Sequence, residues 1–147
     1  MRITFKLNGL DTFKEQIDQL TSDKAEALRD LIAETALEIA AKAKENVADN
    51  GSVKTGALIK SIIATGGDFR WTVTVGAPYA SDVEYGTAAH EIVPKAGHGV
   101  LAFMIDGEWV YVKRVHHPGT HARPFFNPAV EAERPIYDSK LKDLFNS

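Results

Sequence analysis

The five histidines are the residues of this chain best suited to chemistry, and all of them fall in two stretches. Residues 87–98 and 114–123 share them, as His90, His98, His116, His117 and His121. Imidazole is a common metal ligand, so a metal site is the first hypothesis to consider. However, the spacing matches no H-x-x-x-H pair on the apolar face of a helix, and the chain has no cysteine. We therefore predict no metal and no other cofactor, and we interpret both stretches as surface loops.

Motifs for catalysis are also missing from the sequence. It contains no G-x-S-x-G, no G-x-x-x-x-G-K-[ST] and no H-E-x-x-H. The segment VKTGALIKSI at 53–62 has one glycine, and Lys54 precedes it, so we interpret Thr55-Gly56 as a turn that starts a strand. We predict that the protein is not an enzyme. A small metal-dependent enzyme built on the histidine loops is the less favoured alternative.

Composition limits the class of protein and of partner. The chain has 147 residues, of which 44% are hydrophobic and 25% charged, so we predict one globular domain over residues 1–147. A net charge of -3 argues against specific nucleic-acid binding, which relies on an excess of Lys and Arg. Apolar runs of about 18 residues are absent, so no membrane partner is expected.

The regular elements follow from the apolar periodicity. Alternation predicts a strand over residues 2–7, and a helical stripe predicts a short helix over residues 10–20. A long helix should begin near Asp23 and end at Asp49-Asn50-Gly51. Its expected buried stripe consists of Leu28, Ile32, Ala36, Ile39, Ala43 and Val47.

Two hairpins and a last helix complete the pattern. We expect one hairpin from 58–65 and 69–76, and another over 100–112 around Asp106-Gly107. Asn127 should cap the last helix, which Pro135 should kink or restart. The predicted fold class is therefore α+β, with a mainly antiparallel sheet of four or five strands packed by one long helix and a C-terminal helix.

The segment APYASDVEYGT at 77–87 predicts a short helix that Gly86 ends, with Tyr79 and Val83 facing inward and Ala80 as a further candidate. Glu84 lies near the C-terminal end of this helix, where the helix dipole prefers a cation. The carboxylate is therefore either paired or solvated. Arg123, Lys113 and a neighbouring subunit are its candidate partners.

The segment HPGTHARPFFNPA at 117–129 combines three prolines, which restrict the backbone, with two adjacent phenylalanines. We expect at least one of Phe125 and Phe126 to anchor the last helix in the core. The other is a candidate for contact with a partner.

Together, these three segments resemble a family of small phage morphogenesis proteins, the tail-completion or head-tail joining components of long-tailed phages. The family pattern is T-G-x-L-x-x-S-I, then P-Y-A-x-x-V-E-x-G-T, then H-P-G-T-x-x-x-P-F-x-x-P-A. All three occur here in that order, so the resemblance covers roughly residues 8–132.

The resemblance implies a structural protein of the virion neck or upper tail, made in the host cytoplasm from a phage or prophage genome. It would complete the tail and join it to the head, as a ring of six copies that contacts neighbouring neck and tail proteins. DNA would pass through this ring. A tail terminator or tail-tube protein is the alternative. The residues implied for the motif or subunit interface are Thr55, Gly56, Ser61, Tyr79, Glu84, Gly86, Thr87, His117, Pro118, Gly119, Thr120, Arg123 and Phe125.

Overall fold

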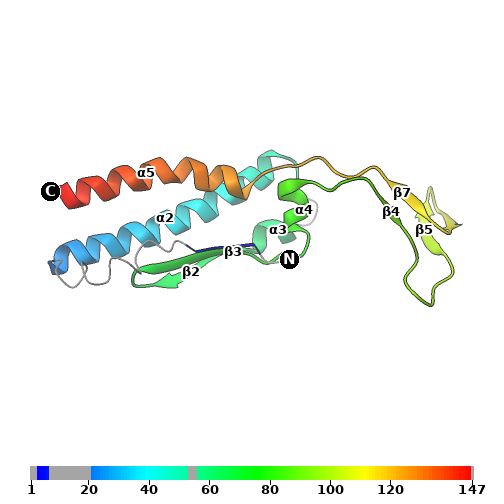
Figure 1. Ribbon diagram of the computed structural model, residues 1–147, viewed down its shortest axis with the longest axis horizontal. Coiled ribbons are helices and arrows are strands. Elements are labelled where there is room, and N and C mark those ends of the chain that lie inside the picture. Colours follow the sequence, from blue (N-terminus) through cyan, green and yellow to red (C-terminus); the bar gives the residue numbers. More distant parts are fainter. Residues whose placement is uncertain (1–2, 7–20, 53–55, 147) are drawn as a thin grey trace.

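A computed structural model describes residues 3–6, 21–52 and 56–146, which form a helical body and a long projecting arm (Figure 1). The body contains β1 (Ile3–Lys6), α2 (Ser22–Asp49), α3 (Ala57–Lys60), β2 (Ile62–Gly67), β3 (Arg70–Val75), α4 (Ala80–Tyr85) and α5 (Phe126–Asn146). The arm contains β4 (His90–Ile92), β5 (Leu101–Ile105), β6 (Glu108–Val112) and β7 (Val115–His117). The short helix predicted over residues 10–20 lies outside the described residues.

The long helix α2 agrees closely with its prediction. It begins one residue before Asp23, and Asn50 caps its C-terminal end. All six members of the expected apolar stripe are buried. Two of them, Ala36 and Ala43, are alanines, and small side chains let the neighbouring elements approach the helix closely.

The strand predicted over residues 58–65 is wrong in its first half, where the chain forms the short helix α3. The Ser61 hydroxyl donates to the Leu58 carbonyl over 2.7 Å, and the Ser61 backbone N–H donates to the Ala57 carbonyl. These local hydrogen bonds close a helical turn before the strand starts. Leu58 and Ile62 are both buried.

The sheet of the body has three strands in the order β1-β3-β2, and both pairings are antiparallel. The predicted single sheet of four or five strands is therefore wrong, although the α+β class, the long helix and the C-terminal helix are confirmed. The hairpin β5-β6 forms with Asp106 and Gly107 at positive φ, as its turn sequence predicts, but it lies out on the arm. Alternation in a sequence indicates a strand without indicating which sheet it joins.

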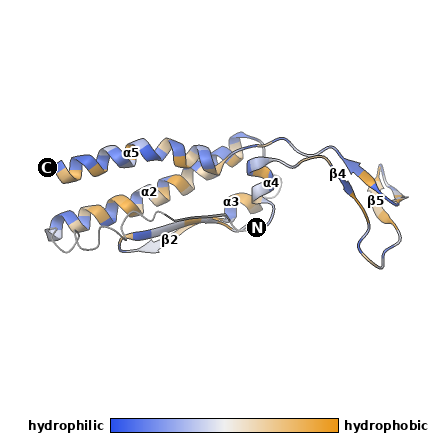
Figure 2. Cartoon of the chain, viewed as in Figure 1, coloured by the Kyte–Doolittle hydropathy of each residue, from blue (hydrophilic) through white to orange (hydrophobic). Residues whose placement is uncertain are grey.

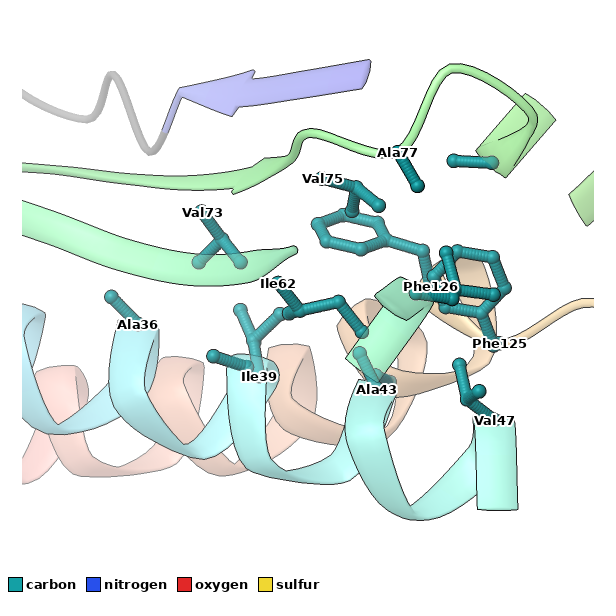
Figure 3. Close-up of a cluster of buried hydrophobic side chains, with 14 residues drawn as sticks. Ala36, Ile39, Ala43, Val47, Ile62, Val73, Val75, Ala77, Phe125 and Phe126 are labelled. Atoms are coloured by element: carbon teal, nitrogen blue, oxygen red, sulfur yellow. The ribbon is translucent and has the colours of Figure 1, made fainter. Parts of the chain in front are cut away.

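The helix α2 packs against the sheet, and α5 runs antiparallel to α2 on its other side (Figure 1). Apolar side chains of the helices and of the sheet meet in one core (Figure 3). Its members are Ala36, Ile39, Ala40, Ala43, Val47, Leu58, Ile62, Val73, Val75, Ala77, Ala80, Phe125, Phe126 and Ala129. None of the helices in the described part of the chain is long and apolar enough to cross a lipid bilayer.

The helix α5 continues through Pro135, so the predicted kink or restart does not divide it. Ion pairs to α2 flank the proline: Lys42 to Glu133 at 2.6 Å, and Lys140 to Glu34 at 2.8 Å. The hydrogen bond to Glu133 raises the pKa of Lys42, although burial opposes this shift. Contacts on both sides of Pro135 thus hold α5 along α2 despite the lost backbone hydrogen bond.

Candidate functional site

The short helix α4 agrees with its prediction at Val83, which packs against the core, but not at Tyr79. Ala80 and Glu84 are buried, and their spacing of four residues places them on one side of the helix. Tyr79 is 41% exposed, so the prediction that it faces inward is wrong. Gly86 follows the last helical residue, as expected.

The carboxylate of Glu84 caps the N-terminus of α5 from 41 residues or more away in the sequence. Its Oε2 accepts the backbone N–H groups of Phe125 and Phe126 at 2.8 and 2.9 Å, and its Oε1 accepts that of Asn127 at 2.9 Å. Helix N-termini leave N–H groups unpaired and favour negative charge. The partner of Glu84 is therefore the start of α5, rather than Arg123, Lys113 or a neighbouring subunit.

The two phenylalanines that follow the arm are both fully buried, with 0% exposure. Their rings meet edge to face, with centroids 6.5 Å apart. The prediction of a core phenylalanine is confirmed, but neither ring is available to a partner. The C-terminal end of α2 holds the same segment, since Asn46 donates to the Phe125 carbonyl at 2.9 Å and Asn50 to the Arg123 carbonyl at 3.1 Å.

The arm comprises residues 87–123. Two Gly-Thr pairs, Gly86-Thr87 and Gly119-Thr120, form its base. Thr87 and Thr120 exchange both backbone hydrogen bonds at 3.0 Å, and their hydroxyls lie 3.0 Å apart. The Arg123 N–H donates to the Val83 carbonyl over 2.7 Å and continues this connection into α4. The second and third motifs of the sequence therefore meet at a single backbone junction.

The glycines of these pairs are required by the close approach of the two chain segments. A Cβ atom on Gly86 would lie 2.5 Å from the Thr120 carbonyl oxygen, and one on Gly119 would lie 2.3 Å from the Thr87 carbonyl oxygen. Both glycines have positive φ, of 72° and 87°. A side chain at either position would thus meet backbone as well as conformational strain.

Replacing Gly119 with alanine should therefore open the base of the arm. We expect amide hydrogen exchange of Thr87 and Thr120 to become at least about tenfold faster, because the two reciprocal hydrogen bonds are lost. Gly97→Ala is the matched control, since Gly97 has φ of 91° but no atom within 4 Å of the new Cβ. Equal exchange rates in the two variants would contradict the close-approach argument.

Residues 87–98 and 114–123 were predicted to be two surface loops, but the structure connects them. They pair with each other through β4 and β7, in the register His90 to His117, Glu91 to His116 and Ile92 to Val115. The strands β4 and β7 have three residues each and little apolar alternation, so no periodic pattern in the sequence indicates them. The pairing links the base of the arm to the hairpin β5-β6 at its far end (Figure 1).

The histidines of the arm do not assemble into a multidentate site. The rings of His90 and His117 lie side by side with centroids 5.1 Å apart. The Gly119 N–H donates to Nδ1 of His117 over 3.1 Å, which places the proton of the neutral ring on Nε2. In the described part of the chain, no group of three or more His, Cys, Asp or Glu side chains could hold a metal ion.

A hollow of about 720 Å³ opens where the arm leaves the body. Residues from all three motif segments line it, namely Gly56, Tyr79, Gly119, Thr120 and Arg123. Leu58 and Val83 add apolar surface, while Asp82 and His121 add polar groups. The structure thus brings together five of the thirteen residues proposed from the sequence, at the junction of arm and body.

The remaining predicted residues have other places in the structure. Ser61 bonds to its own backbone turn, Thr55 lies outside the described residues, and Pro118 is exposed between β7 and the base of the arm. The amides of Asn46 and Asn50 hold the returning segment, whereas the sequence predicted Asn50 only as part of a helix end. An asparagine one turn before a helix end gives no specific signal of such a role.

Comparison with known proteins identifies the class of this chain. Residues 11–86 match the family described as "Bacteriophage HK97-gp10, putative tail-component". This match spans more than half of the 147 residues, so the chain belongs to the HK97-gp10-like family of phage tail components. The match ends at Gly86, where the arm begins. Searches of curated proteins and of solved structures gave no significant match.

Proposed function

We propose that this protein is a structural component of the phage neck or upper tail that completes the tail and joins it to the head. The observation that carries the proposal is the convergence of the three motif segments at the base of the arm. Polar groups at this junction hold the backbone, since both oxygens of Glu84 and both hydroxyls of Thr87 and Thr120 have partners within the chain. Such groups support assembly rather than catalysis.

In this proposal, residues 1–147 act as one domain, and copies form a closed ring, most simply of six, around the tail axis. The arm extends away from the helices and sheet, so it is placed to reach neighbouring copies or neighbouring neck and tail proteins (Figure 1). DNA passes through the ring without sequence-specific contacts. The protein is made in the bacterial cytoplasm and ends in the virion.

Arg123→Ala tests this function, because the Arg123 side chain is exposed and lines the hollow while its backbone holds the junction. In a phage that lacks the wild-type gene and carries this variant, we expect filled heads and normal-length tails that remain separate under the electron microscope. Lys142→Ala, an exposed charge on α5, is the control and should give complete particles.

Three outcomes of this experiment are distinguishable. Separate heads and tails of normal length support head-tail joining. Tails of irregular length favour the tail-terminator alternative instead. A normal yield of joined particles from Arg123→Ala and also from His117→Ala, with unfolding unchanged, would contradict a working surface at the base of the arm.

A further inference from the structure

The histidines His90 and His117 form a pair close to the base of the arm. They lie directly opposite each other on the antiparallel strands β4 and β7, with ring centroids 5.1 Å apart. No residue of the arm is buried, and Figure 2 colours much of β4 as hydrophilic. Since no apolar core supports this part of the chain, its geometry depends on polar contacts, which a change of charge on either ring would alter.

The two rings have different hydrogen-bond partners. Nδ1 of His90 lies 3.0 Å from the Ala88 carbonyl oxygen, which only accepts, so this nitrogen carries a proton. Nδ1 of His117 accepts the Gly119 N–H over 3.1 Å, so this nitrogen carries none. A charged imidazole holds a proton on both nitrogens. His90 therefore keeps its hydrogen bond in either state, whereas His117 loses its hydrogen bond when it becomes charged.

The hydrogen bond to His117 fixes the turn that leads into the base of the arm. A side-chain acceptor that bonds the backbone N–H two residues later is the geometry of an Asx turn. Gly119 has φ of 87°, and the next residue, Thr120, exchanges both backbone hydrogen bonds with Thr87. The bond from Gly119 thus holds the backbone in the direction in which Thr120 meets Thr87.

We infer that His90 and His117 form a pH-sensitive switch, in which neutral His117 keeps the base of the arm closed and protonation opens it. Imidazole changes charge between about pH 5 and 8. A proton on Nδ1 of His117 replaces the acceptor with a donor that faces the Gly119 N–H. When His90 is also charged, two like charges lie side by side and repel each other. The base is therefore closed above this pH range and open below it.

The other charged or titratable side chains around the pair belong to β4, to β7 and the residue before it, and to the hollow beside Gly119. They are Glu91, His116, Arg114, Asp82, His121 and Arg123. Glu91 and His116 are opposite each other in register and face away from the pair, and Glu91 is tied to Arg114 at 3.3 Å. In the hollow, His121 gains a proton over the same pH range, so it requires its own control.

Amide hydrogen exchange of the full-length protein at about pH 7.5 and about pH 5 tests the inference. The readout is the protection factor of Thr87 and Thr120, which relates the rate of each amide to that of an unstructured chain at the same pH. We expect this protection factor to fall at least about fivefold in acid, because a hydrogen bond that holds the base is lost. Equal protection factors at the two pH values would overturn the inference.

Two substitutions at His117 separate its charge from its hydrogen bond. His117→Asn keeps an acceptor for the N–H two residues later but has no charge to gain, so its protection factors should agree at both pH values to within about twofold. His117→Ala removes the acceptor and should give the low protection factor at both pH values. A fall in acid that persists in His117→Asn contradicts the inference.

His116→Asn and His121→Asn are the matched controls, since each removes a histidine of the arm that lies outside the pair. Both variants should keep the full loss of protection in acid. If either substitution abolishes this loss, that histidine is the sensor, and the inference for His117 is wrong. None of these measurements involves head-tail joining, so the inference stands or falls independently of the proposed function.

Pulsed electron paramagnetic resonance measures the position of the arm directly. The chain has no cysteine, so Lys113→Cys on the arm and Glu131→Cys on α5 supply two exposed sites for nitroxide labels. We expect a narrow distribution of label distances near neutral pH and one about twice as wide in acid. The same labels in His117→Asn should give narrow distributions at both pH values. Equal widths at both pH values without this substitution would rule out opening of the base.

Discussion

Replacing Glu84 with alanine should lower the free energy of unfolding by about 3–5 kcal/mol, although Glu84 lies in a motif that suggested an interface. The side chain is 2% exposed, and its two oxygens accept three backbone N–H groups at the start of α5. Removing one partner of a buried charged interaction leaves the other groups desolvated and unpaired, which costs this much in comparable cases. Urea unfolding followed by circular dichroism measures the loss.

Two further variants separate the cap from the charge itself. Glu131→Ala removes an exposed carboxylate from α5, the helix that Glu84 caps. This change should alter stability by no more than about 0.5 kcal/mol. Glu84→Gln keeps one oxygen acceptor, so we expect an intermediate loss of about 1–3 kcal/mol. A Glu84→Ala variant within about 1 kcal/mol of the wild type would show that the cap does not stabilise α5.

The helices were largely predictable from the sequence, because burial of one helix face requires apolar residues every three or four positions. The stripe from Leu28 to Val47 and the ending at Asn50 gave α2 to within a residue. The turn at Asp106-Gly107 was predictable for a similar reason, since only certain residues tolerate positive φ at both central positions. Local rules of this kind need no knowledge of the rest of the fold.

The arm was not predictable, because its architecture depends on pairing between distant segments. The strands β4 and β7 are three residues each, and polar residues such as His90 and His116 give them no apolar alternation. The hairpin β5-β6 has an ordinary strand pattern, which predicts two strands but not that they lie apart from the sheet of the body. A strand pattern predicts an apolar face, but it does not specify whether the same chain or another molecule covers it.

The candidate site shows the same division. Of the thirteen motif residues proposed from the sequence, Gly56, Tyr79, Gly119, Thr120 and Arg123 meet at one hollow. The capping role of Glu84 could not be predicted from the sequence, because the dipole of its own helix α4 does not indicate which other backbone groups the carboxylate reaches. The start of α5 offers three N–H groups to the same carboxylate, and only the tertiary fold brings them within reach.

Replacing Phe125 with alanine should lower the free energy of unfolding by about 3–5 kcal/mol. Its ring is fully buried against Phe126 and the core of the body (Figure 3). Truncation removes apolar contact and leaves a cavity that the surrounding helices cannot fully close. Thermal unfolding and urea titration should both report the change.

Phe145→Ala is the matched control, because Phe145 lies on α5, the helix that begins directly after Phe125, but is 44% exposed. Its loss should stay within about 1 kcal/mol. A small effect of Phe125→Ala would mean that the segment after the arm is held by the Glu84 cap and the asparagine contacts alone. The double variant Glu84→Ala with Phe125→Ala then decides the point. Since both residues fix the start of α5, we expect their losses to be non-additive, whereas independent anchors would give the sum of the two single losses.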